Sequence, residues 1–154
     1  MGLFGGRVDF NPGPATYFVN KPNTYQTYIV KLSPDRQFLW VKFYPLHISS
    51  YTKNSFILSP DENYFYQAGT FRNTIDVVTI QGHVSLTSNG DSDFCIYKID
   101  MAGDIHFIKQ WGSAEFDSYT HMHFDRNQDL VVAGGTSGVL SLDNNTTIIP
   151  KRPY

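Results

Sequence analysis

Short runs of β-branched, aromatic and aliphatic residues, each ended by a polar turn, fill most of this 154-residue chain. Residues 28–32 and 38–42 are two such runs, and Ser33-Pro34-Asp35-Arg36 lies between them. Residues 55–58 and 64–68 flank a second Ser-Pro-Asp turn. Turns of this composition between apolar runs predict β-hairpins, and no stretch shows the 3.6-residue period of a helix. The chain is therefore predicted to be all-β.

The same runs recur along the sequence. Lys31 and Lys98 lie at matching places in two similar runs, 67 positions apart (98 − 31). Further along, Gly69 matches Gly134 at an offset of 65, and the two-residue slip falls in a loop, where insertions are tolerated. The chain is thus predicted to be one segment built of tandem copies. They are a first unit at about 2–68, a second at about 69–134 and a partial third at 135–154.

A unit of four or five short antiparallel strands cannot cover both of its own faces. Units placed side by side around an axis cover one another, as the blades of a β-propeller do. Two units and part of a third leave sheet edges open, which proteins avoid. We therefore expect an incomplete β-propeller that is a fragment of a longer protein or a subunit of an assembly, with a β-sandwich as the main alternative.

Composition supports strands and limits the classes of partner. Hydrophobic residues make up 41% of the chain, aromatic residues 16% and charged residues 17%, as suits half-buried pleated surfaces. The net charge is −2 and the basic residues form no stripe along the sequence, so we expect no nucleic acid partner. No run approaches the ~20 apolar residues of a membrane span, and the N-terminus lacks the features of a signal peptide.

Two local features are expected to be structural. The single cysteine, Cys95, cannot form an internal disulfide and lies in an apolar run, so it is predicted to be a buried and inert thiol. Asp91 and Asp93 have the alternating oxygen atoms of a calcium loop, but the glycine and the distal glutamate of a full loop are missing. A solvated turn is the preferred interpretation, and no cofactor is expected.

The segment Gly6-Arg7-Val8-Asp9-Phe10-Asn11-Pro12-Gly13-Pro14, followed by residues 28–32 and 38–42, resembles the SBBP-type β-propeller repeat. Residues 122–125 and 130–134 resemble the last two strands of that repeat. The resemblance implies a propeller in an extracellular or cell-envelope setting. An intracellular subunit of an assembly is the alternative. The chain departs from the family by holding few units, whereas family propellers close with many blades.

The sharpest candidate for chemistry is His121-Met122-His123-Phe124-Asp125. His121, His123 and Asp125 alternate along a predicted strand, so their side chains are expected on one face, as a metal site requires. The alternative is that the histidines line a face between blades, because the repeat places Phe56 and Leu58 at the equivalent positions.

Recognition is the leading functional hypothesis, since exposed tyrosine and tryptophan commonly anchor partners. The candidates are Tyr17, Tyr25, Tyr51 and Trp111, whereas Trp40 is expected in the core. We predict a non-enzymatic recognition or structural scaffold for a protein or glycan ligand, or for neighbouring subunits that cap its open sheet edges. The competing hypothesis is a metal-dependent or catalytic β-domain that uses the two histidines and Asp125.

Overall fold

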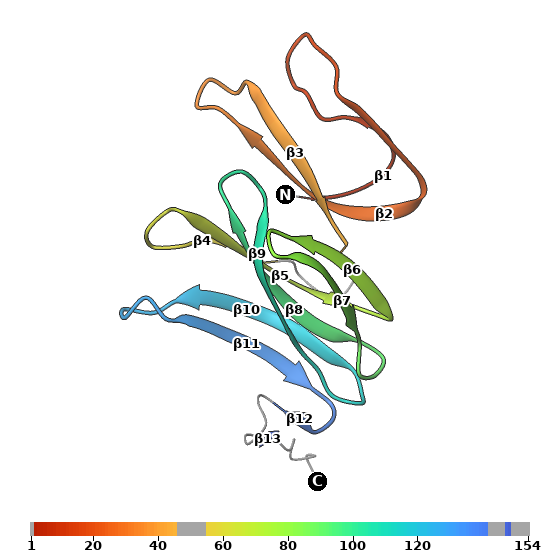
Figure 1. Ribbon diagram of the computed structural model, residues 1–154, viewed down its shortest axis with the longest axis vertical. Helices are drawn as coiled ribbons and strands as arrows, with labels where there is room; N and C mark the ends of the chain where they lie inside the picture. The colour runs from red at the N-terminus through yellow and green to blue at the C-terminus, as the bar shows by residue number, and fades with distance from the viewer. Residues whose placement is uncertain (1, 46–54, 142–146, 149–154) are drawn as a thin grey trace. The chain divides into compact units, whose positions relative to one another are not determined.

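The computed structural model describes residues 2–45, 55–141 and 147–148 (Figure 1). Every regular element among them is a β-strand, which confirms the all-β prediction. This part of the chain contains no helix with the length and hydrophobicity needed to cross a bilayer. The strands are β1 (Gly2–Asp9), β2 (Phe18–Leu32), β3 (Phe38–Tyr44), β4 (Ser55–Leu58), β5 (Tyr64–Phe71), β6 (Thr74–Thr79), β7 (Gly82–Thr87), β8 (Asp93–Asp100), β9 (Ile105–Trp111), β10 (Asp117–Phe124), β11 (Leu130–Thr136), β12 (Leu140–Ser141) and β13 (Thr147–Ile148).

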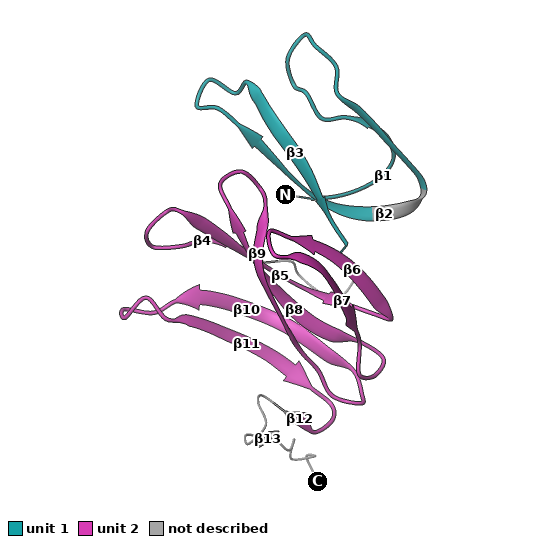
Figure 2. Cartoon of the chain, in the orientation of Figure 1, with its two compact units in different colours: residues 1–47 teal, residues 48–154 magenta. Residues whose placement is uncertain are grey.

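The chain forms two compact units, residues 1–47 and 48–154 (Figure 2). The first is a three-stranded sheet in the order β1-β2-β3. The second contains a six-stranded sheet in the order β4-β5-β8-β9-β6-β7, the β10–β11 hairpin and the short β12–β13 pair. This division differs from the predicted repeat boundary at 68/69, because β5 crosses that boundary and pairs with β8 along its length.

Strand pairing in the first unit recurs in the second with an offset of 67. Gly2 pairs with Tyr28 in the β1–β2 ladder, and Gly69 pairs with Cys95 in the β5–β8 ladder. The ladder runs antiparallel in both cases. With this offset, β1 corresponds to the end of β5 and to β6, β2 corresponds to β7 and β8, and β3 corresponds to β9.

The second hairpin of each copy agrees even in its irregularity. Lys31 pairs with Trp40 between β2 and β3, and Lys98 pairs with Phe107 between β8 and β9. In both hairpins the register shifts directly after the lysine. A bulge at the same step indicates that the two turns have the same geometry.

The turns themselves have that common geometry. Arg36 and Gly103, which are 67 positions apart, both have positive φ angles, 64° and 86°. The Arg36 amide donates to the Ser33 carbonyl, and the Gly103 amide donates to the Asp100 carbonyl. The side-chain oxygens of Ser33 and Asp100 also accept a backbone amide four residues later, at 3.0 Å in each case.

The copies differ where the chain leaves the main sheet. Val8 pairs with Val19, and Ile75 pairs with Leu86, so the register is again the same. In the first unit, one long strand, β2, pairs with β1 along two segments. In the second unit, two separate strands take the place of β2. β7 pairs with β6 as a hairpin, and β8 pairs with β5.

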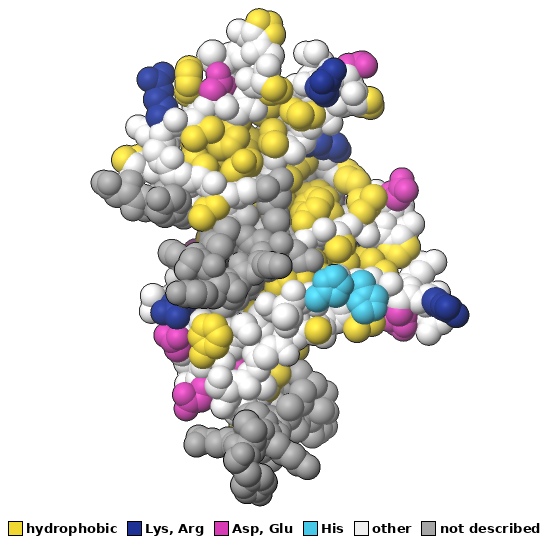
Figure 3. Space-filling model, turned by 180° about the vertical axis from the view of Figure 1, so that it is seen from behind, with side chains coloured by type: hydrophobic (Ala, Val, Ile, Leu, Met, Phe, Trp, Pro, Cys, Tyr) yellow, Lys and Arg dark blue, Asp and Glu magenta, His cyan; other side chains and the backbone are white. Residues whose placement is uncertain are grey.

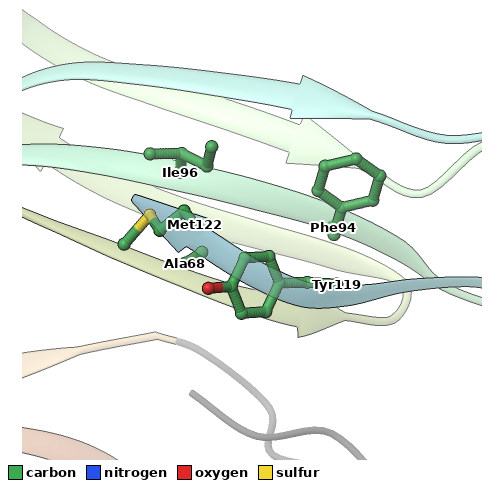
Figure 4. Close-up of a cluster of buried hydrophobic side chains, with 5 residues drawn as sticks. All are labelled: Ala68, Phe94, Ile96, Tyr119 and Met122. Carbon is green, nitrogen blue, oxygen red and sulfur yellow. The ribbon is translucent and has the colours of Figure 1, made fainter. Parts of the chain in front are cut away.

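Each unit has its own apolar core. In the first, Phe4 and Phe10 pack edge to face at 5.0 Å and lie against Val41 and Tyr28. In the second, β10 lies over the main sheet and supplies the fully buried Met122. Met122 and Tyr119 of β10 pack on Ala68 of β5 and on Phe94 and Ile96 of β8 (Figure 4). One sheet thus covers the face of the next, as stacked blades do.

Candidate functional site

An apolar cleft of about 560 Å³ lies in the second unit, between β8 and β9 of the main sheet and β11. Its floor is formed by Phe94 and Ile96 of β8 and by Phe107 and Trp111 of β9. Its wall is β11, through Leu130, Val132 and residues 133–136. We call this feature the apolar cleft.

Aromatic stacking shapes the floor of the apolar cleft. The rings of Phe94 and Trp111 stack with centroids 5.5 Å apart and planes 21° apart. Phe107, next to them on β9, is 50% exposed. Partly exposed aromatic side chains on the floor of a cleft provide contact area for a ligand, because binding removes their apolar surface from water. The sequence prediction for Trp111 as a binding residue thus falls on a residue of this cleft.

The wall of the cleft is the edge of a sheet. Within the described residues β11 pairs with β10 alone. Its counterpart β5 pairs on one side with β4 and on the other with β8. The hairpins correspond because Leu58 pairs with Phe65 and Phe124 pairs with Leu130 at their turn ends. The edge of β11 next to the cleft is therefore the place that β8 occupies beside β5.

A buried polar network adjoins the cleft at the start of β8. The Asp93 carboxylate is fully buried and accepts hydrogen bonds from Gln110 Nε2 (2.6 Å) and from the backbone (3.1 Å) and side-chain (3.0 Å) nitrogens of Asn89. Burial raises the pKa of Asp93, with a smaller contribution from the nearby Asp117 carboxylate, while these hydrogen bonds lower it. A Cβ on Gly112 would overlap the Asp93 carboxylate, so a side chain at this position would have to displace the carboxylate.

Asp117, at the start of β10, is the second buried carboxylate of this region. Its Oδ2 accepts hydrogen bonds from the Ser113 amide (2.5 Å) and hydroxyl (2.8 Å). Its Oδ1 is buried and has no hydrogen-bond partner among the described residues. The sequence prediction of a solvated turn holds for Asp91, which forms an exposed ion pair with Arg72 at 2.9 Å, but not for the buried Asp93.

The predicted metal residues lie on β10 and in the turn after it. His121 and His123 are exposed and their rings stack at 5.8 Å, and histidine side chains are visible at the surface in Figure 3. The Asp125 carboxylate accepts the backbone amides of Asn127 (2.8 Å) and Asp129 (2.9 Å), so it is engaged in the turn. In the described part of the chain, no three His, Cys, Asp or Glu side chains are grouped to hold a metal ion.

The strand pairing changes the repeat equivalence of the histidines. The turn after β4 is one residue longer, because the Ser59 side chain accepts the amide five residues later, whereas the Asp125 side chain accepts the amide four residues later. Phe124 therefore corresponds to Leu58, and His123 corresponds to Ile57 rather than to Leu58. Ile57 packs against the core that β10 covers. The histidines thus occupy the face of β10 that corresponds to a covered face of β4.

The other aromatic candidates are dispersed. Tyr17 is exposed, lies just before β2 and packs against Phe38 at 5.2 Å. Trp40 is half-buried on β3, outside the buried core, with Lys31 Nζ 6.0 Å from its ring. Tyr51 lies outside the described residues, and the side chain of Tyr25 does too.

A second, polar cleft, which the sequence did not indicate, lies at the other end of β8. His106 Nε2 is 2.8 Å from Asp100 Oδ2, and the Tyr64 ring packs edge to face on His106 at 5.3 Å. Partial burial acts to raise the pKa of Asp100, but hydrogen bonds from Asp104 and His106 outweigh it and hold the pKa below its ordinary value.

Cys95 is buried, as expected, and burial raises the pKa of its thiol to about 12. A thiol with so high a pKa stays protonated and unreactive at neutral pH. Among the described residues, the second unit offers an apolar, aromatic cleft beside a strand, β11, that is paired on one side only. No protein-family model, curated protein or solved structure matches the chain.

Proposed function

We propose that the protein is a non-enzymatic scaffold of stacked, propeller-like blades that binds a protein partner in the apolar cleft. The observation that carries this proposal is the position of the cleft: an aromatic floor on β8–β9 lies beside a strand, β11, whose second edge is open within the described residues. A cleft and an edge together recognise an extended protein segment better than either does alone.

The binding mode is strand addition. Main-chain hydrogen bonds to β11 supply affinity, and alternate side chains of the added strand point down onto Phe94, Phe107 and Trp111. These side chains lose their remaining exposure when the strand binds, which contributes roughly 25 cal/mol per Å² of apolar surface. The apolar lining favours a protein strand over a glycan, because sugar hydroxyls need polar partners.

The propeller identity of the scaffold rests on two supports. One is the resemblance of the sequence to the SBBP-type repeat, which also suggests an extracellular or cell-envelope setting. The other is the way in which β10 covers the face of the preceding sheet through Met122 and Tyr119. A protein that repeats this packing in further blades would form the closed scaffold that the family name implies.

Peptide binding tests the proposal. A fluorescently labelled seven-residue peptide of alternating valine and threonine is titrated with the full chain, and fluorescence anisotropy is measured. We expect saturable binding that weakens at least tenfold in Phe107→Glu, because a charge then lies on the cleft floor. Val78→Glu, which changes a 64% exposed valine outside the cleft, is the matched control and should bind normally. Equal binding by both variants would contradict the proposal.

The stacked pair of His121 and His123 supports a second candidate, a metal-dependent domain. Two imidazoles on one strand face can supply half of a tetrahedral zinc site. A zinc titration followed by tryptophan fluorescence tests this candidate. Stoichiometric binding that is lost in His123→Ala would favour it, and the absence of a saturable signal would reject it.

A further inference from the structure

We infer that the protein segment bound in the apolar cleft carries an acidic residue between two apolar residues, and that Lys109 and Lys98 recognise the acid. This inference rests on the scaffold function proposed above and names the chemistry of its partner. It follows from the position of the two lysines among the residues that form the cleft floor.

The floor of the cleft is one face of the β8–β9 ladder. Residues 94, 96 and 98 alternate along β8, so their side chains point to the same face. Their cross-strand partners on β9 share that face. The pairs are Phe94 with Trp111, Ile96 with Lys109 and Lys98 with Phe107. Four of these six residues line the cleft, and the two lysines are the remaining members of the same face.

Along β9 a lysine lies between two aromatic residues. Phe107, Lys109 and Trp111 occupy alternate positions, so neighbouring side chains of this row are roughly 7 Å apart. An extended segment has the same repeat, so three of its alternate side chains lie over these three residues. The outer two meet aromatic rings, and the middle one meets an ammonium group. Because the pattern is symmetric, it holds for either direction of the bound segment.

The two ammonium groups supply the charge beside the cleft, since all twelve lining residues are uncharged. Lys109 is exposed, and its Nζ is 6.0 Å from the centre of the Trp111 ring. The Nζ of Lys98 is 3.9 Å from the centre of the Tyr64 ring. In the described part of the chain, neither ammonium group forms an ion pair with a carboxylate. Each ammonium group has three N–H donors, so a carboxylate can bind beside the ring.

The acidic residue on the same face of β8 is engaged elsewhere. Asp100 lies two positions after Lys98. Its Oδ1 accepts the backbone amides of Ala102 (2.9 Å) and Asp104 (3.0 Å), and its Oδ2 is 2.8 Å from His106 Nε2. The Asp100 carboxylate therefore serves the β8–β9 turn, and the lysines set the sign of the charge beside the apolar cleft.

An acidic residue fits this face better than an apolar or a basic one. A segment with apolar side chains alone would remove water from the ammonium groups without replacing its hydrogen bonds, which costs free energy. A basic residue would add like-charge repulsion. A carboxylate replaces the lost water with charge-assisted hydrogen bonds, which are stronger than neutral ones. The expected partner therefore has an acidic residue with an apolar residue two positions before it and another two positions after it.

Three labelled peptides, each titrated with the full chain and followed by fluorescence anisotropy, test the inference. The first is the valine–threonine peptide, the second has glutamate in place of its second valine, and the third has lysine there. We expect the glutamate peptide to bind about tenfold more tightly than the lysine peptide, because its charge is opposite to that of Lys109. High salt should reduce this preference, because ions screen exposed charges.

A charge exchange identifies the residues responsible. In Lys109→Glu the order of the two charged peptides should reverse, so that the lysine peptide binds more tightly. Lys98→Glu should reduce the preference for glutamate. Lys21→Glu is the matched control, because it changes the net charge equally at an exposed position on β2 of the first unit, and it should keep the preference of the wild type. Circular dichroism verifies that each variant is folded.

Equal binding of the glutamate and lysine peptides, or a preference that is unchanged in Lys109→Glu, would overturn the inference. The valine–threonine peptide separates this outcome from a failure of the scaffold proposal. If that peptide binds while the two charged peptides are not distinguished, the scaffold function stands and the inference fails. If none of the three peptides binds, both fail.

Discussion

The β2–β3 and β8–β9 hairpins have the same backbone structure in two different environments. Their strand registers, their bulges after Lys31 and Lys98 and their left-handed turn residues all coincide. Their exposure does not, since Leu32 is 39% exposed and Ile99 is 0% exposed. Local sequence is therefore sufficient to form the hairpin, whereas the neighbouring strands determine which of its faces is buried.

The largest difference in stability between the two hairpins is expected when the corresponding residues Ile99 and Leu32 are replaced by glutamate. Ile99→Glu places an unpaired charge in a buried site and should lower the free energy of unfolding by about 3–5 kcal/mol. Leu32→Glu should change it by about 0.5 kcal/mol, as is usual at exposed sites. Urea unfolding measures both. Similar losses would mean that the two surroundings are equivalent, contrary to the difference in burial.

The two faces of β10 offer the same contrast within one strand. Met122→Ala removes a fully buried side chain from between β10 and the main sheet, and should cost about 3 kcal/mol through lost burial and a cavity. His123→Ala, one position later on the exposed face, should cost about 0.5 kcal/mol. Thermal unfolding of the two variants checks this. A large cost for His123→Ala would show that a partner already covers the outer face of β10.

Substitutions in the two corresponding turns should have smaller effects on stability. Gly103→Ala puts a Cβ on a residue with a φ of 86° and should lower the free energy of unfolding by about 1 kcal/mol. Arg36→Gly relieves the same conformation in the other hairpin, where φ is 64°, and should raise it by about 0.5 kcal/mol. Opposite signs in chemical denaturation are the expected result, and equal signs would contradict the equivalence of the turns.

The smallest expected effect is a dependence of stability on pH that belongs to the second copy alone. Asp93 corresponds to Gln26 in the first copy. Burial raises the pKa of Asp93 above its ordinary value of 3.8, so the folded state binds the proton more tightly than the unfolded state. Its contribution to stability is complete below pH 3.8 and is lost as pH rises through the raised pKa. Unfolding curves across acidic pH should show this loss in the wild type but not in Asp93→Asn.

Much of the fold could be predicted because its determinants are local. Ser33-Pro34-Asp35-Arg36 and the apolar runs beside it specify a hairpin without help from distant residues. The matching lysines, Lys31 and Lys98, then gave the offset that the strand ladders follow. Burial of Cys95 could also be predicted, since it lies within an uninterrupted apolar run.

The candidate site was harder to predict because it depends on which surfaces meet. Trp111 was a candidate, but nothing in the sequence indicated that residues of β8, β9 and β11 line one apolar cleft with it. Burial of Asp93 and Asp117 likewise depends on long-range packing. His123 was matched with Leu58 because a single extra residue in a turn shifts the alignment, and one position changes the face to which a side chain points.

The central claim is that the apolar cleft receives an extended protein segment that pairs with β11. Amide hydrogen exchange of the full chain, measured with and without the valine–threonine peptide, tests it most directly, because an added strand protects amides at the edge of β11. We predict slower exchange in residues 130–136 when the peptide is present, and no such change in Phe107→Glu. Unchanged exchange along β11 at saturating peptide would contradict the claim.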